Sequence, residues 1–436
     1  MSLPIEKEEE WLRSIILPKL LTDGKLVDNY NVDKADTFQV ESIDINVIGA
    51  AEAFMLTHCY RATIKFVYAG EHITSKLVIK KTPEVPEEVY KSIQFPELFS
   101  NEIDFYTVIL PKIQSLAGGK FAAPKYYYSD LQPVSATVIL GDFATDGWRV
   151  PKDRVGLSLE HARIAMQYLG RFHGFSYALK YNEPAKFAEL TERLRESRYA
   201  RDDMHPDWAL ILKTSLKRMQ NSIAKYQPEV DEEFAKKFIN LTEDYLYYGR
   251  QRVAPQEPIA TLCHGDYLRN NVAFRYDEND QPLDIMMFDY QTLRYSSPMI
   301  DLTTFLAISV YADVRYKHFD TLFDDYCQNL FESYQRHAVV ELPKSINREN
   351  LLKEYIRFLP YSVSISSSFL LALVEPQNVS AAEMMNKQTS PEELIEDTMQ
   401  RGGEIVNREV AHQVKEMFDL SRKYNVDIAE GIKLKE

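Results

Sequence analysis

The spacing of the apolar residues changes along this 436-residue chain, and this change limits the fold more than any other feature of the sequence. Two early segments, 37–48 and 54–70, are rich in β-branched and aromatic residues, and the second alternates as a β-strand does. From residue 158 onward, apolar residues recur at helical spacing. The sequence therefore predicts an α+β protein whose strands come first and whose helices follow.

The length predicts more than one compact unit, because a single hydrophobic core stops growing at roughly 250 to 300 residues. We expect two lobes, residues 1–140 and 141–436, with a cleft between them. The boundary is set near Gly141, where strand character gives way to helical periodicity. A hydrophobic content of 45% excludes a disordered chain, and a net charge of −14 excludes a basic nucleic-acid-binding footprint across the sequence.

The elements expected in each lobe follow from the same patterns. In the first lobe, residues 69–72 predict the turn of a β-hairpin, and segment 96–113 predicts one amphipathic helix with Phe99, Ile103, Tyr106 and Leu110 on its apolar face. In the second lobe, Ser158 is the expected N-cap of a long helix. Further helical patterns lie in 206–226, 231–250, 301–336 and 349–374, and one non-helical island lies at 259–290.

Several features favour a cytoplasmic protein. The three cysteines, Cys59, Cys263 and Cys327, are widely spaced and form no framework pattern, so we expect reduced thiols. The N-terminus has neither the basic nor the apolar region of a secretory signal. The most apolar stretch, 361–374, contains five serines and is shorter than the about 20 apolar residues that cross a bilayer. We therefore expect no membrane insertion.

The island predicts a hairpin that brings two polar side chains together. A strand over 259–263 leads into His264-Gly265-Asp266, and Asn271 opens the next strand. The third strand ends just before Asp289. If residues 277–282 form the turn, Tyr276 pairs with Leu283, and Asn271 then falls opposite Phe288, beside Asp289.

Asp266, Asn271 and Asp289 are the residue types that Mg²⁺-dependent phosphoryl transfer requires. Mg²⁺ prefers oxygen ligands and usually takes only one or two from the protein, which Asn271 and Asp289 would supply. Asp266 would then accept the proton of an attacking hydroxyl. The alternative is that Gly265-Asp266 is an ordinary turn and Asp289 an ordinary strand end, but the joint spacing favours the site.

The spacing of these residues resembles the catalytic loop and metal-binding aspartate of the protein-kinase-like fold. His-Gly-Asp at 264–266 is more similar to aminoglycoside and choline kinases than to protein kinases. Five further segments resemble the insect ecdysteroid kinase-like family, namely FSNEIDFY at 99–106, GRFH at 170–173, FDYQ at 288–291, RY at 294–295 and PMIDL at 298–302. The resemblance covers about residues 40–375 and implies a small antiparallel-sheet N-lobe and a large, mostly helical C-lobe.

The resemblance also implies roles for individual residues. It assigns Asp266 as the catalytic base and Asn271 and Asp289 as the metal ligands. Lys80 matches the strand lysine that grips nucleotide phosphates, and Glu102 matches its helix partner. Lys80 and Lys81 must point to opposite faces of the strand, so only one can serve. The remaining nucleotide-binding candidates are Gly49, Val78, Leu140 and Asp142.

Three further residues near the loop are interpreted as supporting. Asp301 matches the acidic position that holds the catalytic loop in family members, and His264 is expected to hydrogen-bond to nearby backbone. His173 is expected to be a core histidine. Departures from the family pattern lie at 49–53, which is thin in glycine, at Gly141, where an acid is usual, and at 267–269, which lacks the usual Trp.

The resemblance implies an ATP- and Mg²⁺-dependent kinase that phosphorylates a hydroxyl of an ecdysteroid or a similar hydroxylated steroid or xenobiotic. The stretch between Asp289 and Asp301 is too short for the activation segment of a protein kinase, so the acceptor should be a small molecule. Its pocket would draw on aromatic residues of the second lobe, namely Trp208, Tyr245, Tyr247, Tyr248, Tyr311, Tyr316, Phe319 and Tyr361. The alternatives are a choline or ethanolamine kinase, a nucleotide-binding pseudokinase and a steroid carrier.

Overall fold

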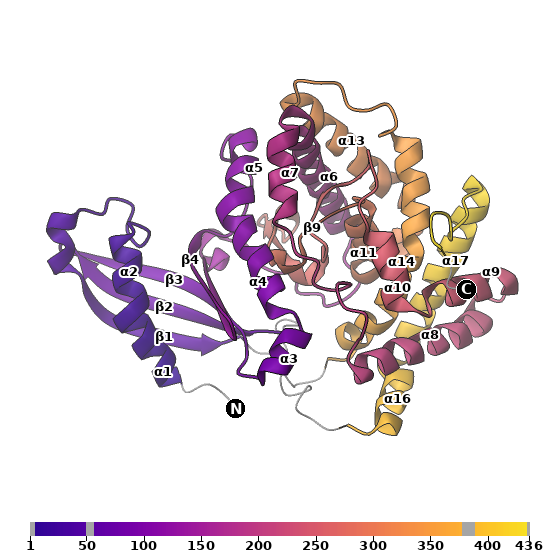
Figure 1. Ribbon diagram of the computed structural model, residues 1–436, viewed down its shortest axis with the longest axis horizontal. Coiled ribbons are helices and arrows are strands. Elements are labelled where there is room, and N and C mark those ends of the chain that lie inside the picture. The colour runs from indigo at the N-terminus through magenta and orange to yellow at the C-terminus, as the bar shows by residue number, and fades with distance from the viewer. Residues whose placement is uncertain (1–4, 49–55, 377–388, 434–436) are drawn as a thin grey trace. The chain divides into compact units, whose positions relative to one another are not determined.

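The computed structural model describes residues 5–48, 56–376 and 389–433, which form two compact units (Figure 1). The described part of the first unit comprises residues up to 99 and 123–148, and the second unit comprises the rest. The sequence prediction placed the boundary at residue 141 and assigned 100–122 to the first lobe. In the structure, segment 100–122 packs with the second unit, and the chain passes from the first unit to the second after Trp148.

The first unit is built on a five-stranded antiparallel sheet in the order β1-β2-β3-β5-β4, as the hairpin pattern predicted. The strands are β1 (Gln39–Val47), β2 (His58–Tyr68), β3 (Glu71–Lys81), β4 (Tyr126–Gln132) and β5 (Ser135–Gly141). Only Ala69 and Gly70 lie between β2 and β3, and both have positive φ. This is the geometry of a tight two-residue hairpin turn, so the turn is shorter than the four residues that the sequence predicted.

One face of the sheet is covered by two N-terminal helices (Figure 1). The alternation predicted for β2 is confirmed, because Tyr60, Ala62, Ile64 and Phe66 are all buried on this face. Against them pack α1 (Ile5–Trp11), the π-helical turn Leu12–Ile16 and α2 (Leu17–Thr22). These N-terminal helices were not predicted from the sequence.

The helix expected over 96–113 is present, but its buried face differs from the prediction. It runs through α4 (Phe95–Asp104), a π-helical turn (Phe105–Ile109) and α5 (Leu110–Ala117). Ile103 and Leu110 are only half-buried, whereas Phe105 and Ile109 are buried together with Phe99 and Tyr106. A π turn adds a residue to the helical repeat, so the apolar face changes phase there.

The second unit is mostly helical. The short helix α3 (Glu87–Ser92) still belongs to the first unit. The second unit contains α5 and the helices that follow it, namely α6 (Leu159–Asn182), α7 (Pro184–Glu192), α8 (Pro206–Tyr226), α9 (Glu232–Thr242), α10 (Tyr245–Val253), α11 (Met299–Ser309), α12 (Ala312–Arg315), α13 (Phe319–His337), α14 (Arg348–Val374), α16 (Pro391–Gln400) and α17 (Gly403–Tyr424). Ser158 caps α6, as predicted, by accepting from the backbone N–H of His161. The patterns 231–250 and 301–336 each contain more than one helix, and the sequence analysis did not predict α16 or α17.

The core of the second unit surrounds α14. This helix contacts α8, α11 and α17, while α13 lies along α6. By length and composition, α14 is apolar enough to cross a membrane, but 78% of its most apolar window is buried inside the protein, as in the core helix of a soluble protein. Two small sheets complete the unit, β6 (Thr261–Cys263) with β9 (Arg294–Ser296), and β7 (Val272–Tyr276) with β8 (Pro282–Met287).

Candidate active site

The β7–β8 hairpin has the register that the sequence predicted over most of its length. Val272 pairs with Met287, and the pairs follow without a shift to Arg275 and Asp284. At the turn the register shifts by one, so Tyr276 pairs with Pro282 instead of Leu283. At the other end, the Phe288 N–H donates to the Asn271 carbonyl at 3.0 Å. Asn271 is therefore opposite Phe288, next to Asp289.

Asn271 joins this hairpin to the loop that carries Asp266. The Asn271 side-chain nitrogen donates to the Asp266 carbonyl at 2.9 Å and to its carboxylate at 3.0 Å. Both bonds use the nitrogen, so the amide oxygen of Asn271 is the atom left to face an ion. The side chain of Asp266 keeps 24% of its surface exposed, which is enough for a small molecule to reach it.

Asp289 has an unusual backbone conformation, with φ 65° and ψ 68°. A residue other than glycine adopts this left-handed region at a cost of order 1–3 kcal/mol, and such residues cluster at functional sites. Burial, together with the carboxylates of Glu102 and Asp289, raises the pKa of Tyr106 well above its usual value. The two carboxylates therefore lie near one phenol, and Glu102 is itself buried.

The donor atoms of Asn271 and Asp289 fit Mg²⁺. One amide oxygen and one carboxylate are hard ligands, and Mg²⁺ commonly takes one or two protein ligands and completes its shell with phosphate and water. Asp289 is half-buried and Asn271 nearly buried, so the pair lies at the edge of the protein interior.

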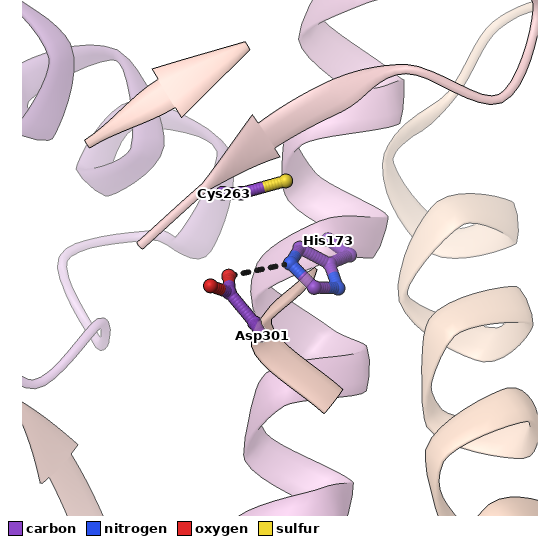
Figure 2. A group of neighbouring side chains, drawn as sticks. All are labelled: His173, Cys263 and Asp301. Atoms are coloured by element: carbon purple, nitrogen blue, oxygen red, sulfur yellow. Dashed lines mark hydrogen bonds and ion pairs between the residues drawn. The ribbon is translucent and has the colours of Figure 1, made fainter. Parts of the chain in front are cut away.

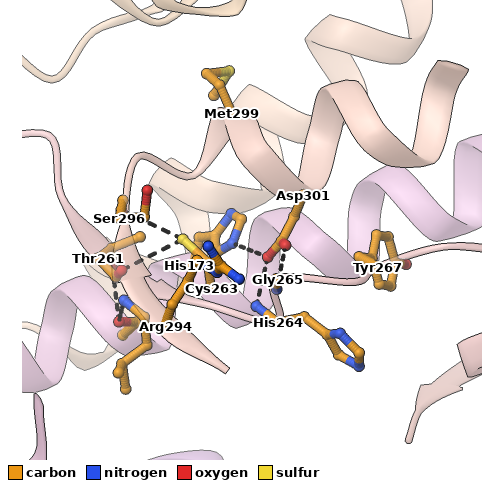
Figure 3. Close-up of polar contacts among 12 residues, drawn as sticks. His173, Thr261, Cys263, His264, Gly265, Tyr267, Arg294, Ser296, Met299 and Asp301 are labelled. Carbon is orange, nitrogen blue, oxygen red and sulfur yellow. Dashed lines mark hydrogen bonds and ion pairs between the residues drawn. The ribbon is translucent and has the colours of Figure 1, made fainter. Parts of the chain in front are cut away.

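The loop before Asp266 is held by Asp301, the first acidic residue of α11 (Figure 3). One Asp301 oxygen accepts from the His264 N–H and the other from the Gly265 N–H, both at 2.7 Å. His173 on α6 lies 3.2 Å from Asp301 through Nε2 and 2.9 Å from the Tyr326 hydroxyl through Nδ1. His173 is thus buried as expected, but it also braces the residue that holds the loop.

His264 links the loop to the end of β8. Its Nε2 lies 3.0 Å from the Phe288 carbonyl, and its Nδ1 lies 3.3 Å from the Asp266 N–H. This pattern assigns the ring proton to Nε2, because Nδ1 must accept from Asp266. His264 therefore bridges backbone groups, and it fixes the residue that precedes Asp289 relative to Asp266.

The buried trio His173, Cys263 and Asp301 has the atoms of a metal site but not the chemistry of one (Figure 2). The Cys263 sulfur lies 3.4 Å from the carbonyls of Thr261, Ser296 and Ser297. Burial, reinforced by the Asp301 carboxylate, raises the pKa of the Cys263 thiol well above its usual value. Both Asp301 oxygens already accept from backbone N–H groups, and one of them also contacts His173, so the trio's donor atoms are engaged within the protein and the trio supports the loop.

Gly265 allows the loop to turn between His264 and Asp266. Its φ is +82°, and a Cβ built on it would lie 2.0 Å from the Thr292 carbonyl oxygen. We expect Gly265→Ala to lower the free energy of unfolding by at least roughly 1–3 kcal/mol, the cost of the backbone strain alone. Because the clash displaces Asp266, phosphoryl transfer should fall by at least about 100-fold, measured as kcat beside thermal unfolding.

Gly147→Ala is the matched control for this variant. Gly147 has a similar φ of +80°, but nothing lies within 4 Å of a Cβ built there. Gly147→Ala should therefore be destabilised by the backbone strain alone, and it should keep its activity because no clash arises. Equal activity in the two alanine variants would show that the close approach of Thr292 to Gly265 does not position the loop.

Segment 195–199, to which no sequence motif pointed, lies beside the loop. Asn101, fully buried on α4, donates to the carbonyls of Arg195 at 2.8 Å and Gln291 at 3.1 Å, and accepts from the Arg195 N–H. This segment brings Arg198 to 3.5 Å from the Asp266 carboxylate. Asn101 belongs to the FSNEIDFY motif, so the motif was a usable signal for it, whereas nothing in the sequence marked Arg198.

The predicted nucleotide-binding residues lie in the first unit, apart from Glu102. Lys81 points to the covered face of the sheet, where its ammonium lies 2.6 Å from Glu8 and 3.5 Å from the centre of the Trp11 ring. Lys80 is thereby directed to the opposite face, as alternation requires, and is largely buried. Lys80 and Glu102 belong to different units, and their pairing stays a prediction.

The other predicted nucleotide-binding residues frame the end of the sheet. Val78 pairs with Leu140 across β3 and β5. Asp142 follows β5, accepts from the Ala144 N–H at 3.1 Å and lies 3.8 Å from the Arg61 guanidinium. Its carboxylate therefore caps the turn after the strand. Gly49 lies outside the described residues.

Solved structures that are similar to this chain include several aminoglycoside phosphotransferases. An aminoglycoside 2''-phosphotransferase-IIIa in complex with GDP and kanamycin is 13% identical, with 85% of this chain and 93% of that chain covered and a TM-score of 0.38. A spectinomycin phosphotransferase bound to AMP is 12% identical, with 80% and 90% covered and a TM-score of 0.33. An aminoglycoside phosphotransferase from Streptomyces rimosus is 16% identical, with 69% and 89% covered and a TM-score of 0.26.

These TM-scores lie below 0.5, so the fold class and the family of the chain follow from its own topology and from the family match. No curated protein matches the chain. The model of the ecdysteroid kinase-like family matches residues 51–338, which is more than half of the chain and includes every residue of the loop and the hairpin. With its antiparallel-sheet unit followed by a mostly helical one, the chain is a small-molecule phosphotransferase with a kinase-like fold, and it belongs to the ecdysteroid kinase-like family.

Proposed function

We propose that this protein is an ATP- and Mg²⁺-dependent kinase that phosphorylates a hydroxyl group of an ecdysteroid or of a similar hydroxylated steroid or xenobiotic. The observation that carries the proposal is the joint placement of Asp266, Asn271 and Asp289, with a hydrogen bond from the Asn271 amide to the Asp266 carboxylate. The family match supports the reaction class. We further propose a cytoplasmic location, because the three cysteines are buried and widely spaced in the sequence and form no framework pattern.

In this mechanism Asp266 positions the acceptor hydroxyl and takes its proton as the oxygen attacks the γ-phosphorus of ATP. The bond between the γ-phosphorus and the oxygen that bridges it to the β-phosphorus breaks, and ADP leaves. Two contacts hold the carboxylate for this task, the hydrogen bond from Asn271 at 3.0 Å and the ion pair with Arg198 at 3.5 Å. Asn271 and Asp289 would hold Mg²⁺, which supplies electrostatic stabilisation of the charge on the transferring phosphoryl group. The backbone bonds from Asp301 keep the loop in place, so little reorganisation accompanies the reaction.

Residues of the first unit would bind the nucleotide. Lys80 carries a positive charge at the end of β3, and we propose that it binds the phosphates. Val78 and Leu140, adjacent across β3 and β5, would contact the adenine. Glu102 would orient Lys80, and Asp142, after β5, would complete the nucleotide site.

The test is mass spectrometry of reactions that contain the purified protein, Mg-ATP and a panel of ecdysteroids, other sterols, choline and aminoglycosides. We expect a phosphorylated product from an ecdysteroid or sterol. Asp289→Asn should abolish the dependence of turnover on Mg²⁺ and lower turnover by about 100-fold or more, because it removes a charged ligand. Nucleotide binding with no product from any acceptor would identify a pseudokinase, and sterol binding without nucleotide would identify a carrier.

A further inference from the structure

The second unit contains an open cavity of about 580 Å³ that the catalytic residues do not line. It lies against α8, the connection between α9 and α10, and residue Ser364 of α14. Most of its wall is apolar or aromatic, including Leu212, Leu216, Leu241, Tyr245, Tyr247 and Tyr248. Cavities of roughly 300–1,000 Å³ with such linings are typical small-molecule sites.

Two contacts connect the wall of this cavity to Asp266. Tyr245 lines the cavity, and its hydroxyl accepts from the Tyr199 hydroxyl at 3.0 Å. The residue before Tyr199 is Arg198, whose guanidinium lies 3.5 Å from the Asp266 carboxylate. The cavity and the proposed catalytic base are therefore neighbours of the same short segment.

This segment is held firmly enough to fix Arg198. The Glu196 carboxylate accepts from the N–H groups of Arg198 at 2.7 Å and Tyr199 at 3.0 Å, and it lies 3.1 Å from Arg294. Arg250 donates to the Tyr199 carbonyl at 2.9 Å. These bonds fix the backbone at Arg198 and Tyr199, and the ion pair with Asp266 holds the Arg198 guanidinium at the other end of its side chain.

Arg198 keeps its positive charge in this setting. Its side chain is 22% exposed. Burial acts to lower the pKa of Arg198, but Tyr361, Tyr245 and Asp266 around it act in the opposite direction, and the pKa lies well above its usual value. A cation therefore lies beside the proposed base at any physiological pH.

The charged residues that line the cavity do not form an acidic cage. Among the described residues there are two lysines, Lys213 and Lys433, and two acids, Glu243 and Asp244. Asp244 is engaged as the N-cap of α10, where it accepts from the Tyr247 N–H at 3.0 Å. A cationic acceptor would find no excess of negative charge in this cavity. The Arg198 guanidinium, 3.5 Å from the Asp266 carboxylate, offsets the negative charge that would otherwise attract such an acceptor.

We propose that this cavity binds the acceptor, and that Arg198 selects an uncharged, largely apolar alcohol over a cationic one such as choline or an aminoglycoside. The inference rests on the proposed function and adds the place of the acceptor and the residue that restricts its charge. Arg198 acts as a positioning and selectivity residue through Asp266, and the apolar wall supplies the affinity.

The experiment uses the full chain, with ecdysone as the uncharged probe and choline and kanamycin as the cationic probes. Leu212→Trp places a large side chain in the cavity, and Lys217→Trp, an exposed position on the same helix, is its matched control. Leu212→Trp should weaken ecdysone binding in calorimetry and raise the KM for ecdysone, each at least about tenfold, whereas Lys217→Trp should change neither by more than about twofold.

Arg198→Met tests the charge. The ratio of kcat/KM for ecdysone to kcat/KM for choline should fall about tenfold or more in this variant, and Arg198→Lys, which keeps the charge, should restore most of it. A purely structural role for Arg198 would lower both values alike. Preference of the wild type for choline or kanamycin would overturn the proposal, as would ecdysone binding that Leu212→Trp leaves unchanged.

A comparison with ATP hydrolysis separates this proposal from the proposed function. If ecdysone binding depends on Leu212 but no nucleotide chemistry depends on Asp266, the cavity binds the sterol and the proposed kinase function is wrong. Asp266-dependent hydrolysis of ATP, without binding or phosphorylation of ecdysone or of any other uncharged panel member, would support the kinase and overturn the cavity.

Discussion

Asp266→Asn should lower phosphoryl transfer by about 1,000-fold, within the 10²–10⁴ range that general bases contribute, and should leave nucleotide affinity nearly unchanged. The amide cannot accept the proton of the attacking hydroxyl, but it has the same shape as the carboxylate. The Asn271 nitrogen still donates to the backbone carbonyl at position 266, so the loop keeps one of the two bonds that join it to the hairpin. The measurement is kcat with the preferred acceptor beside the Kd for Mg-ATP.

Glu278→Gln is the control for this charge change, because Glu278 is exposed in the turn of the same hairpin. It should retain full activity. If Asp266→Asn kept more than about a tenth of the wild-type rate, the base would lie elsewhere and the mechanism would be wrong. A loss of Mg-ATP affinity equal to the loss of rate would place Asp266 in nucleotide binding instead of proton transfer.

The largest effect on stability is expected from Arg315→Met. Arg315, at the end of α12, is 2% exposed and lies 2.7 Å from Glu409 and 2.6 Å from Glu416, both buried on α17. It also donates to the Val310 carbonyl at 2.6 Å. Removing the guanidinium leaves two buried carboxylates without a cation, which should lower the free energy of unfolding by about 3–5 kcal/mol.

Thermal and urea unfolding should both report this loss. Arg348→Met is the control, because Arg348 pairs with Asp324 at the surface, where an ion pair contributes about 0–1 kcal/mol. The triple variant Arg315→Met, Glu409→Met, Glu416→Leu should recover most of the stability, since it replaces the buried charges by apolar side chains. If the single variant were as stable as Arg348→Met, the buried triad would not hold α12 to α17.

The pH should modulate the Arg315→Met defect. Burial raises the pKa of Glu416 above 4.5, and Arg315 opposes this rise. Without Arg315 the pKa of Glu416 should rise further, so the folded state binds a proton more readily than the unfolded one. The stability gained from that proton is complete below about pH 4.5 and is lost as the pH rises through the folded pKa. The difference from wild type should therefore shrink on acidification.

Features that depend on local spacing could be predicted from the sequence. The period-two alternation of β2 fixed which residues face the core. The apolar strands of the β7–β8 hairpin set its register, so Asn271 could be placed beside Asp289, although the turn has five residues instead of the six that were predicted. The sequence did not predict which face of the helix after Phe95 is buried, because no local sequence signal marks a π turn. It also missed α17, where the family match has already ended.

The residues that surround Asp266 from distant parts of the chain could be identified only in the packed fold. Asp301 accepts from the two backbone N–H groups before it, Asn101 braces segment 195–199, and Arg198 arrives from that segment at 3.5 Å. Asp266, Asn271 and Asp289 could be identified from the sequence because their roles depend on their spacing within one loop and hairpin. Arg198 lies 68 residues from Asp266 in the chain, and its ion pair is a through-space interaction that arises only once the packed helices bring the two segments together.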